Sequence, residues 1–125
     1  MRGTERRTLP GTDIALSRLG IGGGSLANAR GEDMVRAVAD AAWDAGLRHF
    51  DTAAFHAAGE SERRLGDALA ARPRDEFVLS TKVGRFIRPD GREGFDCTAS
   101  GTEAAIGTAL ERLRMGGSRS SSSMT

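Results

Sequence analysis

The sequence predicts an α/β fold, in the form of the N-terminal portion of a (β/α)8 barrel: a β-hairpin followed by three strand–helix units. Two observations predict the class. Short apolar segments alternate with longer segments of helical periodicity, the order expected of parallel strands joined by right-handed crossovers. The last apolar segment is nonpolar on both faces, as in a strand that is covered on both sides. A third observation, the chemistry-bearing residues at the strand ends, favours a barrel.

The first elements are a hairpin, a strand and a helix. Residues 7–19 alternate loosely between apolar and polar around a Pro-Gly pair, which predicts an N-terminal β-hairpin. A short apolar strand at 19–21 then runs into the glycines at 22–24. Residues 31–46 carry apolar side chains at helical spacing, and Gly46 is well placed to end that helix.

The second strand–helix unit and the third strand follow directly. Residues 48–53 form the second predicted strand, and residues 61–71 form the second helix, which ends before Pro73. The third strand, 76–84, is the one that is apolar on both faces. These segments complete the alternation on which the α/β assignment rests.

A long polar segment separates the third strand from the last helix. We expect a loop over 85–99 and then a helix that begins at a capping box, Ser100 to Glu103, and runs to about Leu113. Residues 1–113 therefore form the predicted partial barrel. Residues 114–125 are a Gly/Ser-rich tail, which we expect to be either disordered or out of frame.

Composition narrows the classes of function. A chain of 125 residues, 38% hydrophobic, can form one small domain, and its net charge of +1 argues against a nucleic-acid-binding face. The single cysteine, Cys97, precludes an internal disulfide and fits a reducing compartment. His49, His56 and Cys97 fall in no metal-ligand spacing, so no metal is expected. Since no apolar run reaches membrane-spanning length, we expect a cytoplasmic protein with neither nucleic-acid nor membrane partners.

The glycine run offers a second α/β reading, the doubly wound dinucleotide fold. Gly22, Gly24 and Ala27 satisfy a loose form of its fingerprint, and Asp51 ends the next strand. In that fold, however, the glycine loop opens directly into a helix whose N-terminus meets the pyrophosphate. Here residues 28–31 intervene, and the acidic residue comes later than the usual spacing of about 20 residues.

The barrel reading accounts for more of the chain. Chemistry in such barrels lies at the C-terminal ends of the strands, where this sequence places the 22–24 glycines, Asp51 and Lys82. Lys82 is the only lysine among 18 basic residues. An ammonium differs from a guanidinium in being compact and able to lose its proton, so this position is a candidate functional site beside Asp51.

Three ordered motifs resemble the aldo-keto reductase superfamily: "FDTA" from Phe50, "GESERRLGDAL" from Gly59, and "FVLSTKVGR" from Phe77. The "STKVGR" wording with the later "GFDCTASG" is most similar to the bacterial fucose or galactose dehydrogenase branch. The resemblance covers about residues 7–113. It implies a (β/α)8 barrel that binds NAD or NADP across its mouth and transfers hydride between the nicotinamide and an aldehyde, a ketone or C1 of an aldose.

The resemblance also assigns roles to residues. In the family an aspartate supports a lysine, the lysine lowers the pKa of a tyrosine that exchanges a proton with the substrate oxygen, and a histidine orients that oxygen. Asp51 matches the aspartate and Lys82 the lysine. Gly23 and Gly24 lie in the loop that meets the nicotinamide end of the cofactor, with Asp51 beside it. The predicted catalytic residues are Asp51, His56 and Lys82, and the predicted cofactor-binding residues are Gly23, Gly24 and Asp51.

His56 departs from the family pattern. The family has a tyrosine five residues after the aspartate, but this chain has His56 there and contains no tyrosine. Imidazole is shorter than phenol and has an unperturbed pKa of about 6.5 rather than about 10. It can exchange a proton near neutral pH, but loss of an acid–base group typically lowers the rate about 10²- to 10⁴-fold.

The end of the chain is the second departure. A full barrel needs about 250 residues and eight strands, so we expect a truncated, inactive fragment with an exposed apolar sheet face. If the tail serines use TCN codons, a shifted frame after Gly117 reads as apolar residues with a terminal His-Asp option. That reading resembles the family's fourth strand. We therefore hypothesise a frameshift near Leu113, which the downstream DNA would test. The alternative function is a non-catalytic binding or interaction module on a half-barrel.

Overall fold

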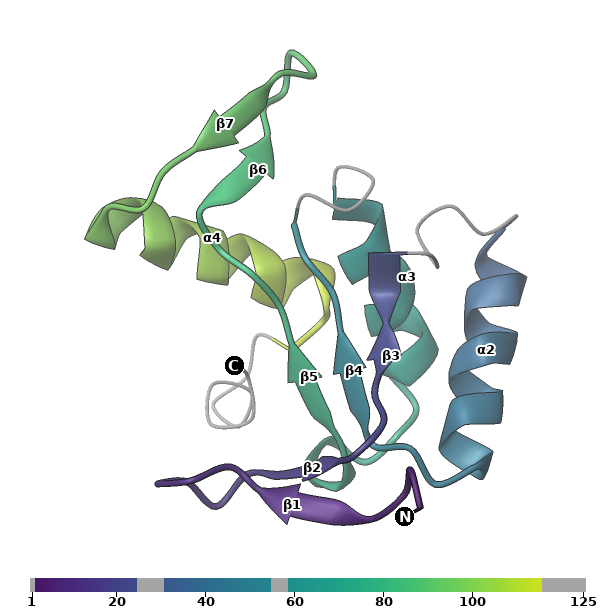
Figure 1. Ribbon diagram of the computed structural model, residues 1–125. Coiled ribbons are helices and arrows are strands. Elements are labelled where there is room, and N and C mark those ends of the chain that lie inside the picture. Colours follow the sequence, from purple (N-terminus) through teal and green to yellow (C-terminus); the bar gives the residue numbers. More distant parts are fainter. Residues whose placement is uncertain (1, 25–30, 55–58, 116–125) are drawn as a thin grey trace.

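The computed structural model describes residues 2–24, 31–54 and 59–115. At its centre is a parallel sheet of three strands in the spatial order β3 (Ile21–Gly22), β4 (His49–Asp51) and β5 (Val78–Ser80) (Figure 1). The register pairs Phe50 with Ile21 on one side and with Leu79 on the other. The parallel pairing and the sequential order confirm the predicted strand–helix alternation.

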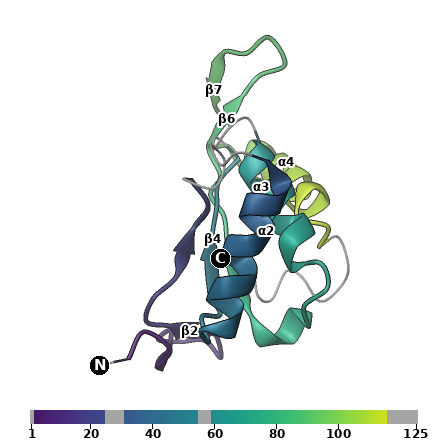
Figure 2. The ribbon, with the colours of Figure 1, turned by 90° about the vertical axis from the view of Figure 1, so that its right-hand side faces the viewer.

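Two helices cover one face of this sheet. These are α2 (Glu32–Asp44) and α3 (Glu60–Leu69), and both lie on the same side of the strands (Figures 1 and 2). Gly46, with a φ of 91°, adopts the left-handed conformation just beyond α2 and ends the helix as predicted. The third helix, α4 (Ala99–Arg112), lies beside α3 and β5 (Figure 1).

The N-terminal hairpin lies across the end of the sheet at which the parallel strands begin (Figure 1). It pairs β1 (Arg6–Thr8) with β2 (Ala15–Ser17) in antiparallel fashion, as predicted. The backbone N–H of Arg48 donates to Ser17 Oγ at 3.2 Å, which ties the hairpin to the start of β4. A short 3₁₀ turn, Arg74–Glu76, leads into β5 at the same end.

The core lies between the sheet and its helices. Phe50, Leu65 and Leu79 are fully buried there. The ring of Phe77 packs edge-on against those of Phe50 and Trp43, at centroid distances of 6.3 and 6.0 Å. Full burial of such side chains contributes about 1.5–3 kcal/mol each to stability, so this face holds the domain together.

The segment predicted to be a polar loop contains a second hairpin. β6 (Arg85–Ile87) pairs with β7 (Glu93–Phe95) and projects away from the sheet (Figure 1). Gly91 makes the turn with a φ of 85°, and Gly94 leaves room for the ring of Phe86 opposite. Pro89, Asp90 and Gly91 are a turn signal that the sequence analysis passed over, because charged residues surround the few apolar ones in these two strands.

The last helix also begins earlier than predicted. Its N-cap is Thr98, whose hydroxyl accepts a hydrogen bond from the backbone N–H of Gly101 at 3.1 Å. Asp96 fixes this cap by accepting from both the hydroxyl and the N–H of Thr98. Ser100 lies within the first turn, so the predicted capping box at Ser100 is wrong, because a threonine with a carboxylate behind it caps the helix two residues upstream.

The sheet face opposite the helices corrects another prediction. We expected exposed apolar surface there, but this face carries His49, Asp51 and Ser80, which are half-buried and joined by hydrogen bonds. Val78 is the apolar member, and it is buried. Side chains alternate along a strand, so the same three-residue strands that send Phe50 and Leu79 into the core send polar groups to the other face.

The boundaries differ from prediction at both ends. Leu19, expected in the first barrel strand, is 59% exposed, because β3 starts at Ile21. Met115, expected in the tail, packs into the core, and Arg114 forms an ion pair with Asp67 at 3.0 Å. The rest of the predicted tail, residues 116–125, and the predicted catalytic His56 lie outside the described residues.

Candidate active site

The candidate site lies where the three parallel strands end. Gly22 and Asp51 are the last residues of β3 and β4, and Lys82 follows the end of β5 by two residues. The register pairs Asp51 with Gly22 and with Ser80. Because the strands are parallel, their carboxyl ends share one edge of the sheet, and side chains far apart in the sequence meet there.

Asp51 and Lys82 form the predicted pair. Lys82 Nζ donates to Asp51 Oδ2 at 2.6 Å and to the carbonyl oxygen of Thr52 at 3.0 Å. The lysine side chain is 57% exposed and that of Asp51 is 39% exposed, so the pair faces the barrel mouth. An ammonium has three N–H donors, of which these contacts use two. The structure thus brings together the two residues on which the functional prediction depends.

The carboxylate of Asp51 is stabilised by its neighbours. Burial pushes its pKa upward, but the hydrogen bonds from Lys82 and Ser80, with the charges of Lys82 and His49, outweigh that effect. The net result is a pKa below the ordinary value for aspartate. Asp51 is therefore an anion throughout the neutral range and acts as a fixed acceptor for Lys82.

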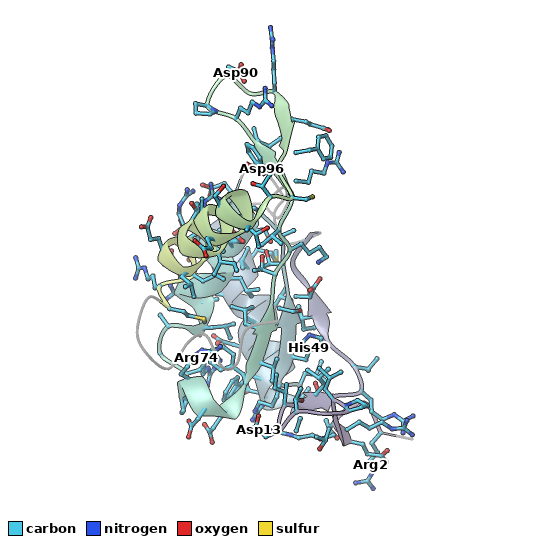
Figure 3. The ribbon with its side chains drawn as sticks, turned by 90° about the vertical axis from the view of Figure 1, so that its left-hand side faces the viewer. Arg2, Asp13, His49, Arg74, Asp90 and Asp96 are labelled. Carbon is cyan, nitrogen blue, oxygen red and sulfur yellow. The ribbon has the colours of Figure 1, made fainter. Side chains whose placement is uncertain are left out.

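Ser80 and His49 extend this pair along the sheet. Ser80 Oγ donates to Asp51 Oδ1 at 2.6 Å, and His49 Nε2 lies 3.1 Å from Ser80 Oγ. Burial lowers the pKa of His49, while the charge of Asp51 acts in the opposite direction. Figure 3 shows His49 at the level of the sheet, far from the hairpin that carries Asp90.

The glycines of the predicted cofactor loop have different environments. A Cβ on Gly22 would meet no atom within 4 Å, whereas a Cβ on Gly23 would lie 2.6 Å from Ser61 Oγ and 2.8 Å from the carbonyl oxygen of Asp51. Gly23 is buried, and its carbonyl accepts from Ser61 Oγ at 3.0 Å. Gly24 is half-buried at the end of the described segment. Close packing therefore accounts for Gly23 without any ligand, and the open surface is at Gly22.

These surroundings fit the reacting end of a nicotinamide cofactor. The backbone at Gly22 is bare, and it adjoins the carboxylate of Asp51 and the exposed ammonium of Lys82. A flat ring needs such an open surface beside the polar pair. Of the predicted cofactor-binding residues, Asp51 and the backbone of Gly23 and Gly24 lie at this edge, and Gly22 and Lys82 are the exposed residues beside them that could also contact the ring.

A cleft opens beside Lys82, between the β6–β7 hairpin and α4. Its volume is about 370 Å³, within the range of about 300–1,000 Å³ typical of small-molecule sites. Apolar and small side chains line most of it, among them Phe86, Ile87 and Ala105. Arg112 also lines it. The sequence analysis does not predict this cleft, because the cleft depends on the β6–β7 hairpin and the sequence predicts a loop there.

Glu62 is a further polar residue that the sequence analysis did not single out. It is fully buried on α3, where it accepts from Thr81 Oγ1 at 2.7 Å and from Arg112 at 3.1 Å. It thereby joins α3 to the segment that carries Lys82 and to α4. One signal could have revealed it: Glu62 shares a helical face with Leu65 and Leu69, and a charge on an apolar face is buried and paired.

The described part of the chain contains neither a metal-binding cluster nor a membrane-spanning helix. Residues 2–24, 31–54 and 59–115 contain no group of three or more histidine, cysteine, aspartate or glutamate side chains placed to hold a metal ion. Within the same residues, no helix is long and apolar enough to cross a membrane.

The fold and the strand-end pair define a partial (β/α)8 barrel with a polar site at its mouth, and comparisons with known proteins agree. The sequence profile of the Aldo/keto reductase family matches residues 18–116. The chain is 41% identical to D-threo-aldose 1-dehydrogenase from a Pseudomonas species, over 80% of this chain and 37% of that protein. It is 34% identical to L-galactose dehydrogenase from Arabidopsis thaliana, over 89% of this chain and 35% of that protein.

Solved structures support the same assignment. The holo form of an aldo-keto reductase from Bacillus halodurans superposes with a TM-score of 0.79 at 30% identity, over 88% of this chain and 36% of that one. A glycerol dehydrogenase from Gluconobacter oxydans gives a TM-score of 0.75 at 28% identity, over 89% and 36% of the two chains. The chain belongs to the aldo/keto reductase family, and it spans about a third of the length of the curated relatives it matches. The predicted partial barrel is confirmed.

Proposed function

We propose that this chain is part of an NAD- or NADP-dependent oxidoreductase that transfers hydride between the nicotinamide and an aldehyde, a ketone or C1 of an aldose. The observation that carries the proposal is the 2.6 Å hydrogen bond between Lys82 Nζ and Asp51 Oδ2 at the carboxyl edge of the sheet. The sugar substrate class is supported by the two aldose and galactose dehydrogenase relatives. Neither relative favours a non-catalytic interaction module.

The proposal gives a role to each of the residues at the strand ends. When bound, the cofactor supplies or accepts the hydride. Asp51 and the carbonyl of Thr52 hold the ammonium of Lys82 in place, and its remaining N–H donor is available to a group in the mouth. That positive charge stabilises negative charge as it develops on the substrate oxygen. The bare backbone at Gly22 gives the nicotinamide its surface.

We assign proton exchange with the substrate oxygen to His56, which stands where the family has its tyrosine. The support is the sequence motif alone. An imidazole titrates near neutral pH, so it can both donate and accept a proton under mild conditions.

We propose that the 125-residue chain on its own has no measurable turnover. Its described parallel strands number three, and a closed barrel of this kind has eight. A reducing, cytoplasmic location is supported by the single cysteine, Cys97, which is exposed as a free thiol.

The unique lysine provides a direct test of the cofactor site. An amine-reactive acylating reagent has two targets in this chain, Lys82 and the N-terminal amine, which peptide mapping separates. We expect NADPH or NADH to slow acylation of Lys82 and to leave that of the N-terminus unchanged. Equal rates at Lys82 with and without saturating cofactor would overturn the proposed site, and oxidation of NADPH by aldehydes or sugars would overturn the proposed inactivity.

A further inference from the structure

The Asp51–Lys82 pair is one end of a longer hydrogen-bonded chain. Going down the interior face of the sheet, Lys82 donates to Asp51, Ser80 donates to Asp51 Oδ1 at 2.6 Å, and His49 Nε2 meets Ser80 Oγ at 3.1 Å. The two strands produce this order through their register. Asp51 and His49 lie two residues apart on one face of β4, and Ser80 is the partner of Asp51 on β5.

The directions of these bonds follow from the donors available. The Ser80 hydroxyl has one proton, which it gives to the carboxylate of Asp51. Its oxygen must therefore accept from His49, which fixes the proton of the neutral imidazole on Nε2. His49 thus donates toward the mouth through Ser80.

The surroundings of the His49 imidazole also hold it in place. A Cβ on Gly20 would lie 2.9 Å from His49 Nδ1 and 3.2 Å from its carbonyl oxygen, so the imidazole rests against bare backbone. The partner of His49 on β5 is Val78, which is apolar. Of the described charged groups, Asp51 on the same strand is the one whose charge acts on the ring, and Lys82 binds to Asp51. The core helices lie on the other face of the sheet.

We propose that His49 is a positioning residue: through Ser80 it holds the carboxylate of Asp51 in the orientation that grips Lys82. Nothing in the Asp51–Lys82 contact alone fixes the plane of the carboxylate, because a single bond to Oδ2 leaves the group free to rotate. The bond to Oδ1 removes that freedom, and His49 in turn fixes the hydroxyl. The inference rests on the proposed function, since it concerns how the lysine of that site is held.

Matched variants at His49 test the role of its Nε2–H. A glutamine reaches with its amide to the position of Nε2, whereas an asparagine reaches only to that of Nδ1. We expect His49→Gln to leave the acylation rate of Lys82 near that of the wild type, and His49→Asn to raise it. The upper reference is Asp51→Asn, which replaces the charged acceptor of the ammonium by a neutral one and should raise the rate about 1.4- to 5-fold, the range expected for the loss of an exposed ion pair.

A second pair of variants tests the hydroxyl. Ser80→Thr keeps the bridge and should behave like the wild type, whereas Ser80→Ala removes it and should raise the rate toward that of Asp51→Asn. The proposal is overturned if His49→Asn and Ser80→Ala both stay at the wild-type rate while Asp51→Asn rises. It is also overturned if His49→Gln and His49→Asn have equal effects, because that pattern indicates only the loss of a ring.

An NMR titration of the two histidines covers the case of a variant that does not fold. The chain has only His49 and His56, so a His56→Gln variant assigns both signals. We expect the pKa of His49 to fall further in Asp51→Asn, because the charge that raises it is lost. An unchanged pKa would overturn the coupling. None of these measurements uses NADPH, so the proposed function can fail in the cofactor experiment while this inference stands, and the reverse.

Discussion

The two faces of the central sheet are made by the same strands and have opposite characters. On the helix side, Phe50 and Leu79 are fully buried in the core. On the interior side, His49, Asp51 and Ser80 are half-buried and bonded to one another. Since successive side chains of a strand point to opposite faces, the strand His49–Asp51 supplies the core with one side chain and the site with two.

This difference separates stability from chemistry. The helix side stabilises the domain through burial of apolar area, which is non-directional and large. The interior side exchanges hydrogen bonds with water for hydrogen bonds within the protein, so its net contribution is small but its geometry is fixed. Substitutions on the first face should therefore unfold the chain, and substitutions on the second should change the site and leave the fold.

The largest effect should come from Phe50→Ala. Its ring is fully buried and packs edge-on against Phe77, so truncation should destabilise the domain by about 3–5 kcal/mol. That is a large part of the total stability of a typical domain, and we expect the variant to be largely unfolded by circular dichroism. The matched control is Phe95→Ala on the projecting hairpin, where the ring is 67% exposed. Equal melting temperatures for the two variants would contradict the division into two faces.

Glu62→Ala should rank second. Glu62 is fully buried and neutralises Arg112 while accepting from Thr81, so its removal leaves a partly buried cation and a hydroxyl without their acceptor. Breaking such a buried pair costs about 3–5 kcal/mol. The control is Glu93→Ala, whose ion pair with Arg85 is half-exposed and worth about 0–1 kcal/mol. Chemical denaturation of both variants measures the difference, and a Glu62 variant as stable as the Glu93 variant would show that the buried pair does not tie the mouth to the core.

The neighbouring glycines give the third comparison. Alanine at Gly23 would meet Ser61 Oγ and the backbone of Asp51, so Gly23→Ala should cost about 1–3 kcal/mol through overpacking. Alanine at Gly22 meets no atom within 4 Å and should change stability by no more than about 0.5 kcal/mol. The methyl group at 22 should instead weaken protection of Lys82 by NADPH. A stable Gly23→Ala that loses this protection would give Gly23 a binding role in place of a packing role.

The smallest effect should be the pH dependence of stability from the interior face. The pKa of His49 is lowered by burial, and that of Asp51 is lowered because its hydrogen bonds outweigh burial. The unfolded chain therefore binds protons more readily at both positions, and stability falls as the pH drops. The first loss begins below 6.5, the ordinary value for histidine, and Asp51 adds to it below 3.8.

His49→Gln isolates the first part of this loss. Its melting temperature should fall less between about pH 7 and about pH 5 than that of the wild type, because a glutamine takes up no proton. Calorimetry at the two pH values measures the difference. If both proteins lose the same stability in that window, the pKa of His49 is not shifted by its surroundings.

Much of the fold could be predicted because it depends on short-range patterns in the sequence. Apolar spacing gave the helix that became α2, and Gly46 gave its end. The hairpin β6–β7 was missed although Pro89, Asp90 and Gly91 mark its turn, because its short strands are mostly polar. The need for Gly94 appears only once the strands are paired, since Phe86 lies opposite. Part of the site could be predicted. Asp51 ends one predicted strand and Lys82 lies near the end of the next, and the carboxyl ends of parallel strands meet at one edge of the sheet.

By itself the sequence determined the parallel α/β order, the family and the pairing of Asp51 with Lys82. Each of these depends on local periodicity or on ordered motifs, which can be recognised in the sequence alone. Only the tertiary structure decided which glycine is packed and which is open, that Glu62 is buried against Arg112, and that His49 reaches Asp51 through Ser80. The physical reason is register. A shift of one residue between β4 and β5 would turn Ser80 to the opposite face, and no pattern within either strand alone fixes that shift.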